Sequence, residues 1–265
     1  MNAHSRDVAA RLDLAINAAR QAGNITIEYF RCDDLEILRK EDDTPVTIAD
    51  RRSEEYLRET IAEKFPEDGI LGEEFGEQQG SSGYRWILDP LDGTKSFIHG
   101  VPLYGTLIGV EYEDEDLIGV IRIPALDECL YASRGQGAWY FVGHNQPKPA
   151  RVSKRQPLSK ALFVTSEVNV FEETGRRAVY DRLQAASRLT RTWGDCYGYL
   201  MVATGRADLM VDAQMAVWDA AALLPILEEA GGSFTDWQGR RTIRGGEGIA
   251  TNGLILAEVL KIVRA

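Results

Sequence analysis

The chain has 265 residues and a formal net charge of −11 at pH 7. A chain of this length buries about three-quarters of its unfolded surface, so its stability requires no disulfide framework. The acidic balance argues against a nucleic-acid-binding surface, and no apolar run approaches the ~18 residues that a membrane span requires. The three cysteines are scattered and odd in number, which favours a reducing compartment, and we expect a cytoplasmic protein.

Two amphipathic helices are predicted in the first part of the chain. Residues 5–30 carry apolar side chains at helical spacing, with polar residues between them. A second helix is predicted over about 49–65, where Leu57 and Ile61 share one face and Pro66 stops the helix.

The next segments predict strands whose ends deliver acidic residues. GILGEE (69–74) is a short apolar run that leads to two glutamates, and YRWILD (84–89) ends in an aspartate, with a Gly/Ser-rich loop at 76–83 between them. Further runs rich in β-branched and aromatic residues suggest an antiparallel meander over 104–113, 117–123, 129–133 and 138–142. The first half is therefore predicted to be α+β.

A Pro- and Lys/Arg-rich stretch at 145–158 predicts a boundary between two units, residues 1–150 and 151–265. The second unit alternates strands and helices as in an α/β layer. Its predicted strands are 161–166, 207–211 and 232–236, and its predicted helices are about 171–186, 197–203 and 218–230.

The segment WILDPLDGT (86–94) places two aspartates three positions apart around a proline. Its apolar start predicts a short strand, so Asp89 would lie at a strand's C-terminal end, where α/β folds place their sites. Pro90 cannot continue a ladder of hydrogen bonds and would fix a turn. With the chain bent there, Asp89 and Asp92 would converge, and Leu91 would offer its backbone carbonyl.

Gly93 and Thr94 would then open a helix, whose free N–H groups and positive dipole end favour an anion such as phosphate. Carboxylates beside a phosphate cradle repel one another and the anion unless a cation lies between them. Oxygen donors without His or Cys select Mg²⁺ or Mn²⁺. The plainer interpretation is an aspartate-rich turn whose acids are solvated.

Other phosphatase chemistries lack their nucleophiles here. An aspartyl-phosphate enzyme needs D-x-D-x-T, but DPLDGT has one residue too many between its acids. A cysteine phosphatase needs C-x₅-R, but only four residues separate Cys129 from Arg134, and no histidine stands in an Arg-His-Gly. A metal-activated water is the remaining choice.

Three separated motifs follow one another along the chain: GILGEE (69–74), WILDPLDGTKSF (86–97) and VWDAAALLPILEEAGG (217–232). With them the chain resembles the inositol-monophosphatase-like family of Mg²⁺-dependent, lithium-sensitive phosphatases, over essentially its whole length. The resemblance implies a layered α-β-α-β-α sandwich of the inositol monophosphatase/fructose-1,6-bisphosphatase type, with the active site between the two halves. It also implies a phosphate monoester as substrate and a homodimer.

The resemblance further implies the metal ligands. Glu73, Asp89 and the carbonyl of Leu91 would hold one ion, and Asp89, Asp92 and Asp219 would hold a second. A weaker third site would involve Glu73 and waters, so two to three Mg²⁺ ions are expected, with Mn²⁺ as a possible substitute. The first unit would carry most of these ligands, and the second would carry Asp219 and the specificity residues.

In such enzymes a water on a metal attacks phosphorus, oriented by a Thr–Asp pair that here would be Thr94 and Asp50. Glu73 joins this pair as a predicted catalytic residue, and Gly93 and Thr94 are predicted to bind the phosphate. Lys40 resembles the family's lysine near the mobile metal loop.

The substrate is predicted from two departures from inositol-hydrolysing members. The chain reads DGTKSF (92–97) where those members usually have D-G-T-x-N-F, and it carries TWGDCYGYLMVATGRADLMVD at 192–212. Both look closer to the histidinol-phosphate phosphatase type. The predicted substrate is therefore L-histidinol phosphate, with inositol 1-phosphate as the alternative. Nucleotide 3′-phosphatase and fructose-1,6-bisphosphatase activities are less favoured.

Histidinol phosphate carries an ammonium group and an imidazole, so its pocket should present acids beyond those that hold metal. Asp195 and Asp212 are the candidates, and Trp193 and Tyr197 would supply an aromatic wall.

Plainer interpretations stand beside these roles. Asp50, Asp219 and Asp195 could each only cap a helix, and Asp212 could be an ordinary loop acid or accept a sugar hydroxyl. From a different class, the chain could be a catalytically silent cation-binding homologue, although Glu73 and the other motif residues are intact. Turnover discriminates these possibilities.

Overall fold

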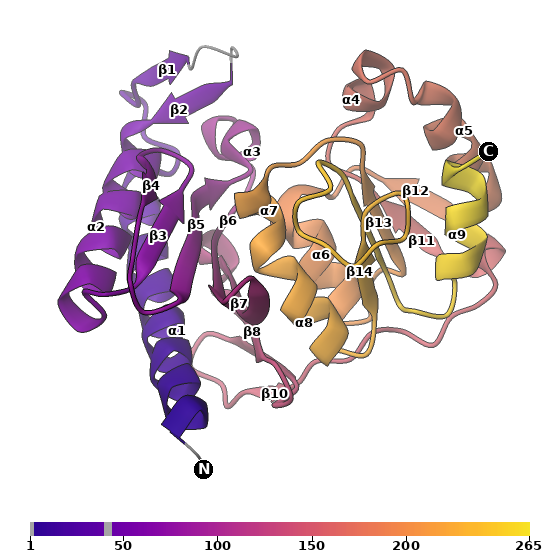
Figure 1. Cartoon of the computed structure of the whole chain (residues 1–265). Helices are drawn as coiled ribbons and strands as arrows, with labels where there is room; N and C mark the ends of the chain where they lie inside the picture. The colour runs from indigo at the N-terminus through magenta and orange to yellow at the C-terminus, as the bar shows by residue number, and fades with distance from the viewer. Residues whose placement is uncertain (1–2, 40–43) are drawn as a thin grey trace.

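The computed structural model describes residues 3–39 and 44–265, which stack in alternating layers of helix and sheet (Figure 1). From left to right, Figure 1 shows a helix pair, a large sheet, a middle layer of helices, a smaller sheet and an outer layer of helices. This arrangement confirms the α-β-α-β-α sandwich that the resemblance implies. No helix within the described ranges has the length and apolarity that crossing a membrane requires.

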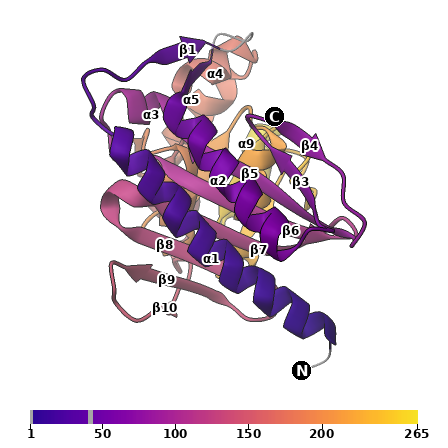
Figure 2. The same cartoon turned by 90° about the vertical axis from the view of Figure 1, so that its left-hand side faces the viewer.

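The first layer consists of α1 (Ala3–Tyr29) and α2 (Ile48–Lys64), which lie across one face of the large sheet (Figure 2). Both predicted N-terminal helices are thereby confirmed within two residues at each end. Alanines on the buried face of α1 pack with Leu57 and Ile61 of α2 in one apolar cluster. Small side chains on α1 allow the two helices to approach each other closely.

The large sheet has eight strands in the order β10-β9-β8-β7-β6-β5-β3-β4. Neighbours are antiparallel except β3 and β5, which are parallel. The strands are β3 (Gly69–Gly72), β4 (Gly76–Gln78), β5 (Tyr84–Asp92), β6 (Gly105–Tyr112), β7 (Glu115–Ile123), β8 (Glu128–Ser133), β9 (Ala138–Val142) and β10 (Lys148–Pro149). The predicted meander is confirmed as β6 to β9. The loop expected over 76–83 is wrong in part, because its first residues pair with β3 as β4.

The middle layer consists of α6 (Asp195–Ala203), α7 (Val217–Ala221) and α8 (Leu223–Glu229). The single helix predicted over about 218–230 is wrong, because the chain forms two helices there. Pro225 has no N–H to donate to the carbonyl of Ala221, so a continuous helix would lose that bond. The junction packs tightly on the large sheet: a side-chain carbon at Gly119 would lie 2.1 Å from the carbonyl oxygen of Ala222.

The smaller sheet has five strands in the order β12-β11-β13-β15-β14. They are β11 (Leu162–Val164), β12 (Leu189–Arg191), β13 (Leu209–Asp212), β14 (Ser233–Thr235) and β15 (Gly248–Thr251). Its outer face is covered by α4 (Val168–Glu173), α5 (Arg177–Ala186) and α9 (Leu256–Val263). The single helix predicted over about 171–186 is wrong, because Gly175 at φ +69° ends the first helical segment and separates α4 from α5.

The remaining helices, turns and strands of the described residues are short. They are a two-stranded sheet of β1 (Ile37–Arg39) and β2 (Pro45–Thr47), the helix α3 (Thr94–Ile98), and the 3₁₀ turns η1 (Pro124–Leu126) and η2 (Leu158–Lys160). The largest apolar cluster lies between the two sheets and takes side chains from both, for example Ile121 and Leu130 from one and Met210 and Phe234 from the other. The division into two units at residue 150 stays a prediction.

Candidate active site

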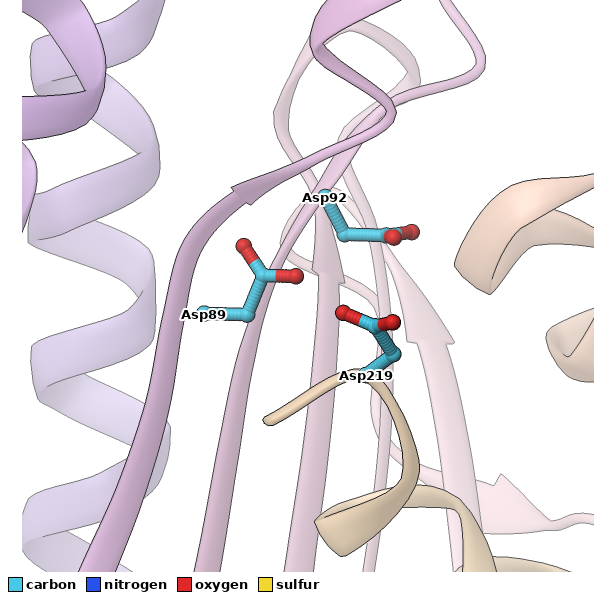
Figure 3. A group of neighbouring side chains, drawn as sticks. All are labelled: Asp89, Asp92 and Asp219. Atoms are coloured by element: carbon cyan, nitrogen blue, oxygen red, sulfur yellow. The ribbon is translucent and has the colours of Figure 1, made fainter. Parts of the chain in front are cut away.

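Three aspartates converge at the C-terminal end of β5 in the large sheet (Figure 3). Asp89 and Asp92 come from the end of β5, and Asp219 comes from the first turn of α7. One carboxylate oxygen of each lies within 4.8 Å of the corresponding oxygens of the other two. The structure therefore brings together acids that the sequence separates widely.

A bulge in β5 places the two strand aspartates on one face. Asp89 pairs with Leu107 of β6 and Asp92 pairs with Gly105, so three steps along β5 match only two along β6. Residues three apart in a regular strand point to opposite faces, and one extra residue reverses that parity. The turn predicted at Pro90 is therefore wrong: β5 continues through it to Asp92.

Hydrogen bonds hold the bulge in place. The Leu91 N–H donates to Asp89 Oδ1 over 3.1 Å, and the carbonyl of Pro90 accepts a bond of 3.0 Å from Thr106 Oγ1. The carbonyl of Leu91, which was predicted to bind metal, accepts a bond of 3.1 Å from Thr94 Oγ1.

Asp219 is oriented by the start of its own helix. The N–H of Ala216 donates to Asp219 Oδ2 over 2.7 Å, and Ala216 is the residue that precedes α7. Asp219 therefore caps the helix with one of its two carboxylate oxygens, Oδ2. The other oxygen is free to face Asp89 and Asp92, as Figure 3 shows for the side chain as a whole.

Burial and mutual repulsion disfavour the ionised form of the three aspartates. Burial, and then the neighbouring acids, raise the pKa of Asp89 and of Asp92 well above the ordinary value, and burial raises the pKa of Asp219 to about 7. One buried and two partly buried carboxylates this close ionise together only if a cation neutralises them. The donor set contains oxygens alone and fits a hard divalent cation such as Mg²⁺.

Glu73 lies beside this group, directly after β3. Its N–H donates to the carbonyl of Leu88 over 3.2 Å, and its charge contributes to the raised pKa of Asp89. The structure thus places Glu73 next to Asp89, although the tightest group of acids consists of the three aspartates.

Thr94 and Asp50 form a hydrogen-bonded pair. The one hydroxyl proton of Thr94 is shared between Asp50 Oδ1 at 3.2 Å and the carbonyl of Leu91 at 3.1 Å, and Asp50 Oδ2 accepts from the N–H and the hydroxyl of Thr47 over 2.8 and 2.6 Å. Thr47 is the N-cap of α2, so Asp50 completes a capping box and also reaches Thr94. Gly93 precedes α3 at φ +82°, a conformation that glycine adopts without strain.

A cavity of about 110 Å³ opens beside the aspartates. Its lining includes Asp92 and Asp219 of the acidic group together with Asp195 and Asp212, the two acids predicted to recognise a cationic substrate. Asp195 has a φ of +51°, which an L-residue rarely adopts and which is frequent at functional sites. Burial, and then the charge of Asp212, raise the pKa of Asp195 to about 6.

The two specificity candidates differ in their hydrogen bonds. Asp212 accepts bonds from the N–H of Ser166 over 3.0 Å and from the hydroxyl of Tyr199 over 2.8 Å. Asp195 accepts one long bond, 3.4 Å, from Ser96 Oγ. Gly194 occupies the N-cap of α6, so the capping interpretation of Asp195 is wrong.

Comparison with known proteins identifies the relatives of this chain. A model of the inositol monophosphatase family matches residues 7–265. The chain belongs to the inositol monophosphatase family. This membership makes it a phosphatase, as its motifs predict.

Individual members resemble the chain over most of its length. It is 46% identical to a histidinol-phosphatase of Chlorobaculum parvum, with 91% of each chain covered, and 39% identical to a histidinol-phosphatase of Mycobacterium tuberculosis, with 96% and 98% covered. The solved structure of an inositol monophosphatase from Zymomonas mobilis matches all of both chains with a TM-score of 0.85 at 32% identity.

Two predictions of site residues remain, the aromatic wall and Lys40. The predicted aromatic wall is absent from the lining of the cavity: Trp193 is 40% exposed, with Arg191 over its ring, and the hydroxyl of Tyr197 accepts a hydrogen bond from Arg206. Lys40 falls outside the described residues.

Further residues that the sequence motifs do not single out line the same cavity, among them Ser166, Cys196 and Tyr199. Signals for two of them were present. Ser166 ends a predicted strand, and Tyr199 lies in the helix predicted over about 197–203, close in sequence to Asp195.

Proposed function

We propose that this phosphatase hydrolyses L-histidinol phosphate to L-histidinol and phosphate, with Mg²⁺ as cofactor. One observation carries the substrate assignment: Asp195 and Asp212 line the same cavity as Asp92 and Asp219. Acids in excess of those needed for metal suit a substrate that carries phosphate at one end and an ammonium and an imidazole at the other. The identity to two histidinol-phosphatases supports the same substrate.

The residues that would hold metal are those of the acidic group. Glu73, Asp89 and the carbonyl of Leu91 would bind one Mg²⁺, and Asp89, Asp92 and Asp219 would bind a second, with a weaker third site at Glu73. When bound, Mg²⁺ supplies Lewis-acid polarisation of the phosphoryl group and lowers the pKa of the attacking water, and Mn²⁺ would substitute for it.

Thr94 and Asp50 would handle the proton. Thr94 Oγ1 accepts a proton from the attacking water while its own proton passes along the 3.2 Å hydrogen bond to Asp50 Oδ1. Burial raises the pKa of Asp50, which makes its carboxylate a better proton acceptor than an exposed aspartate. Gly93 and Thr94, at the start of α3, would orient the phosphate through their backbone N–H groups.

Asp195 would contact the cationic end of the substrate. Asp212 already accepts bonds from Ser166 and Tyr199, whereas within residues 3–39 and 44–265 Asp195 accepts a single long bond, from Ser96. Asp195 is therefore better placed to exchange its present partner for an ammonium or imidazolium group. Asp212 would contribute its charge while keeping its protein partners.

The proposal is tested by Mg²⁺-dependent phosphate release from L-histidinol phosphate and from myo-inositol 1-phosphate, measured side by side as kcat/KM. A preference of about a hundredfold for histidinol phosphate, or ~2.7 kcal/mol, is expected. An equal or greater value for inositol 1-phosphate would overturn the substrate and leave the metal chemistry standing. Similarity to the Zymomonas mobilis enzyme makes inositol 1-phosphate the second candidate. A homodimer and a cytoplasmic location stay predictions.

A further inference from the structure

Glu54 of α2 is a fully buried carboxylate outside the acidic group. Its side chain is 0% exposed, and it stands one helical turn after Asp50. Glu54 Oε1 accepts bonds from Arg58 Nε over 2.7 Å and from the N–H of Phe75 over 3.2 Å. Glu54 Oε2 accepts a bond of 2.7 Å from the N–H of Glu74.

The carboxylate fills the inside of the turn between β3 and β4. A side-chain carbon at Gly72 would lie 2.0 Å from Glu54 Oε1, so only glycine fits where the turn begins. At the other end, the guanidinium of Arg58 donates to the carbonyl of Gly76. Glu54 and Arg58 together therefore bind the backbone that directly follows Glu73, while the Glu54 carboxylate packs against Gly72, which precedes it.

Burying a carboxylate carries a large desolvation penalty. One guanidinium and two N–H groups compensate for this penalty without giving a large net stabilisation. The turn itself does not require this acid, because N–H groups in a surface turn bond to water without loss. The arrangement instead restricts the backbone from Gly72 to Gly76 to one conformation. Within this stretch, the N–H of Glu73 donates to the carbonyl of Leu88 over 3.2 Å, so Glu73 stands beside Asp89, the next residue of β5.

We propose that Glu54 is a positioning residue that sets Glu73 against Asp89 for metal binding. The inference rests on the proposed metal role of Glu73. It also gives α2 a double task, because Asp50 on the preceding turn holds Thr94. One rigid helix would then set both the metal-binding turn and the proton-handling pair.

The test compares Mg²⁺ affinities, measured by titration calorimetry, of the wild-type protein and of Glu54→Gln. An outer-shell partner of a metal ligand typically contributes about 10–100-fold to affinity, and a loss of this size is expected. Asp208→Asn is the matched control. Asp208 is also 0% exposed and also accepts bonds from an arginine, Arg155, and from a backbone N–H, that of Leu162, but it lies in the smaller sheet's half. Its substitution should leave the Mg²⁺ affinity unchanged.

A double-mutant cycle with Glu73→Gln separates positioning from general destabilisation. If Glu54 acts through Glu73, then Glu54→Gln lowers the affinity in the wild-type background and has no further effect when Glu73 is already Gln. An equal loss in both backgrounds, an equal loss in Asp208→Asn, or unchanged affinity in Glu54→Gln would each overturn the inference.

Glu73→Gln alone tests the underlying assignment. Unchanged affinity in that variant would remove Glu73 from the metal site and the role of Glu54 with it. Reduced affinity in Glu73→Gln with normal affinity in Glu54→Gln would reject the positioning role alone. If Glu54→Gln does not fold, Glu54→Asp serves instead, because it keeps the charge beside Arg58 and withdraws the carboxylate from the N–H groups of Glu74 and Phe75.

Discussion

The backbone N–H of Cys196 donates a hydrogen bond of 2.5 Å to Asp92 Oδ2. Asp92 belongs to β5 of the large sheet, and Cys196 belongs to the first turn of α6 in the middle layer. The positive end of α6 therefore faces an acid of the proposed metal site and stabilises its ionised form. The bond also fixes the orientation of Asp92 relative to the second half of the chain.

Asp92→Asn should abolish phosphate release. We expect a loss of at least about a thousandfold, or ~4 kcal/mol, because a shared metal ligand is removed. The variant should remain folded and, in EDTA, melt no lower than the wild type, because one of three crowded charges is gone. The measurement combines a phosphate-release assay with thermal melting by circular dichroism. Near-normal turnover would reject the proposed mechanism and favour a metal site without a catalytic role.

The stability gained from Mg²⁺ should increase with pH. Burial raises the pKa of Asp219 to about 7 without metal, so the folded protein binds a proton that the unfolded chain releases near its ordinary pKa of about 3.9. The free energy of unfolding of the metal-free protein therefore falls as pH rises through this window. Mg²⁺ competes with that proton and removes the penalty.

This dependence is measured as the difference in Tm between Mg²⁺ and EDTA at about pH 5.5 and about pH 8, on either side of the pKa of Asp219. The difference should be larger at the higher pH, and Asp219→Asn should reduce the change between the two. Equal differences at both values of pH would contradict the role of this group.

Thr94→Ala should lower kcat by about a hundredfold or more and change KM little, because positioned proton transfer contributes about that much. Thr94→Ser keeps the hydroxyl that bonds to Asp50 and should retain most of the activity. Steady-state kinetics at saturating Mg²⁺ give both constants. A loss of the same size in the serine variant would show that the methyl group, and not proton handling, matters at this position.

Asp195→Asn should lower kcat/KM for L-histidinol phosphate by about tenfold or more, or ~1.4 kcal/mol, while the value for myo-inositol 1-phosphate stays the same or rises. The reason is the loss of a charge opposite the cationic end of the substrate. Since burial raises the pKa of Asp195 to about 6, the wild-type preference should also decline as pH falls below that value. Asp116→Asn is the control, because Asp116 lies at the start of β7, at the opposite end of the strands from Asp89 and Asp92, and this substitution should leave the preference between the two substrates unchanged. An equal fall in kcat/KM for both substrates in Asp195→Asn would reject a role of Asp195 in discrimination.

Local patterns in the sequence predict the helices and strands whose partners are close along the chain. The apolar spacing predicts α1 and α2, and the alternation of strands and turns predicts the meander, because these patterns arise from burial of a single face. The acids were also recognisable, since Asp89, Asp92 and Asp219 lie in motifs of distinctive composition. Where local rules failed, as in the helices divided at Gly175 and before Pro225, backbone chemistry outweighed a favourable apolar period.

The geometry of the site depended on partners far along the chain. The parity that brings Asp89 and Asp92 to one face arises from pairing of β5 with β6, and a single sequence does not encode register directly. The same holds for the bond from Cys196 to Asp92 and for Glu54 beneath the turn of Glu73. The sequence by itself determined which oxygens were present, and the tertiary structure decided which of them meet, because burial and strand pairing act between residues that are distant along the chain.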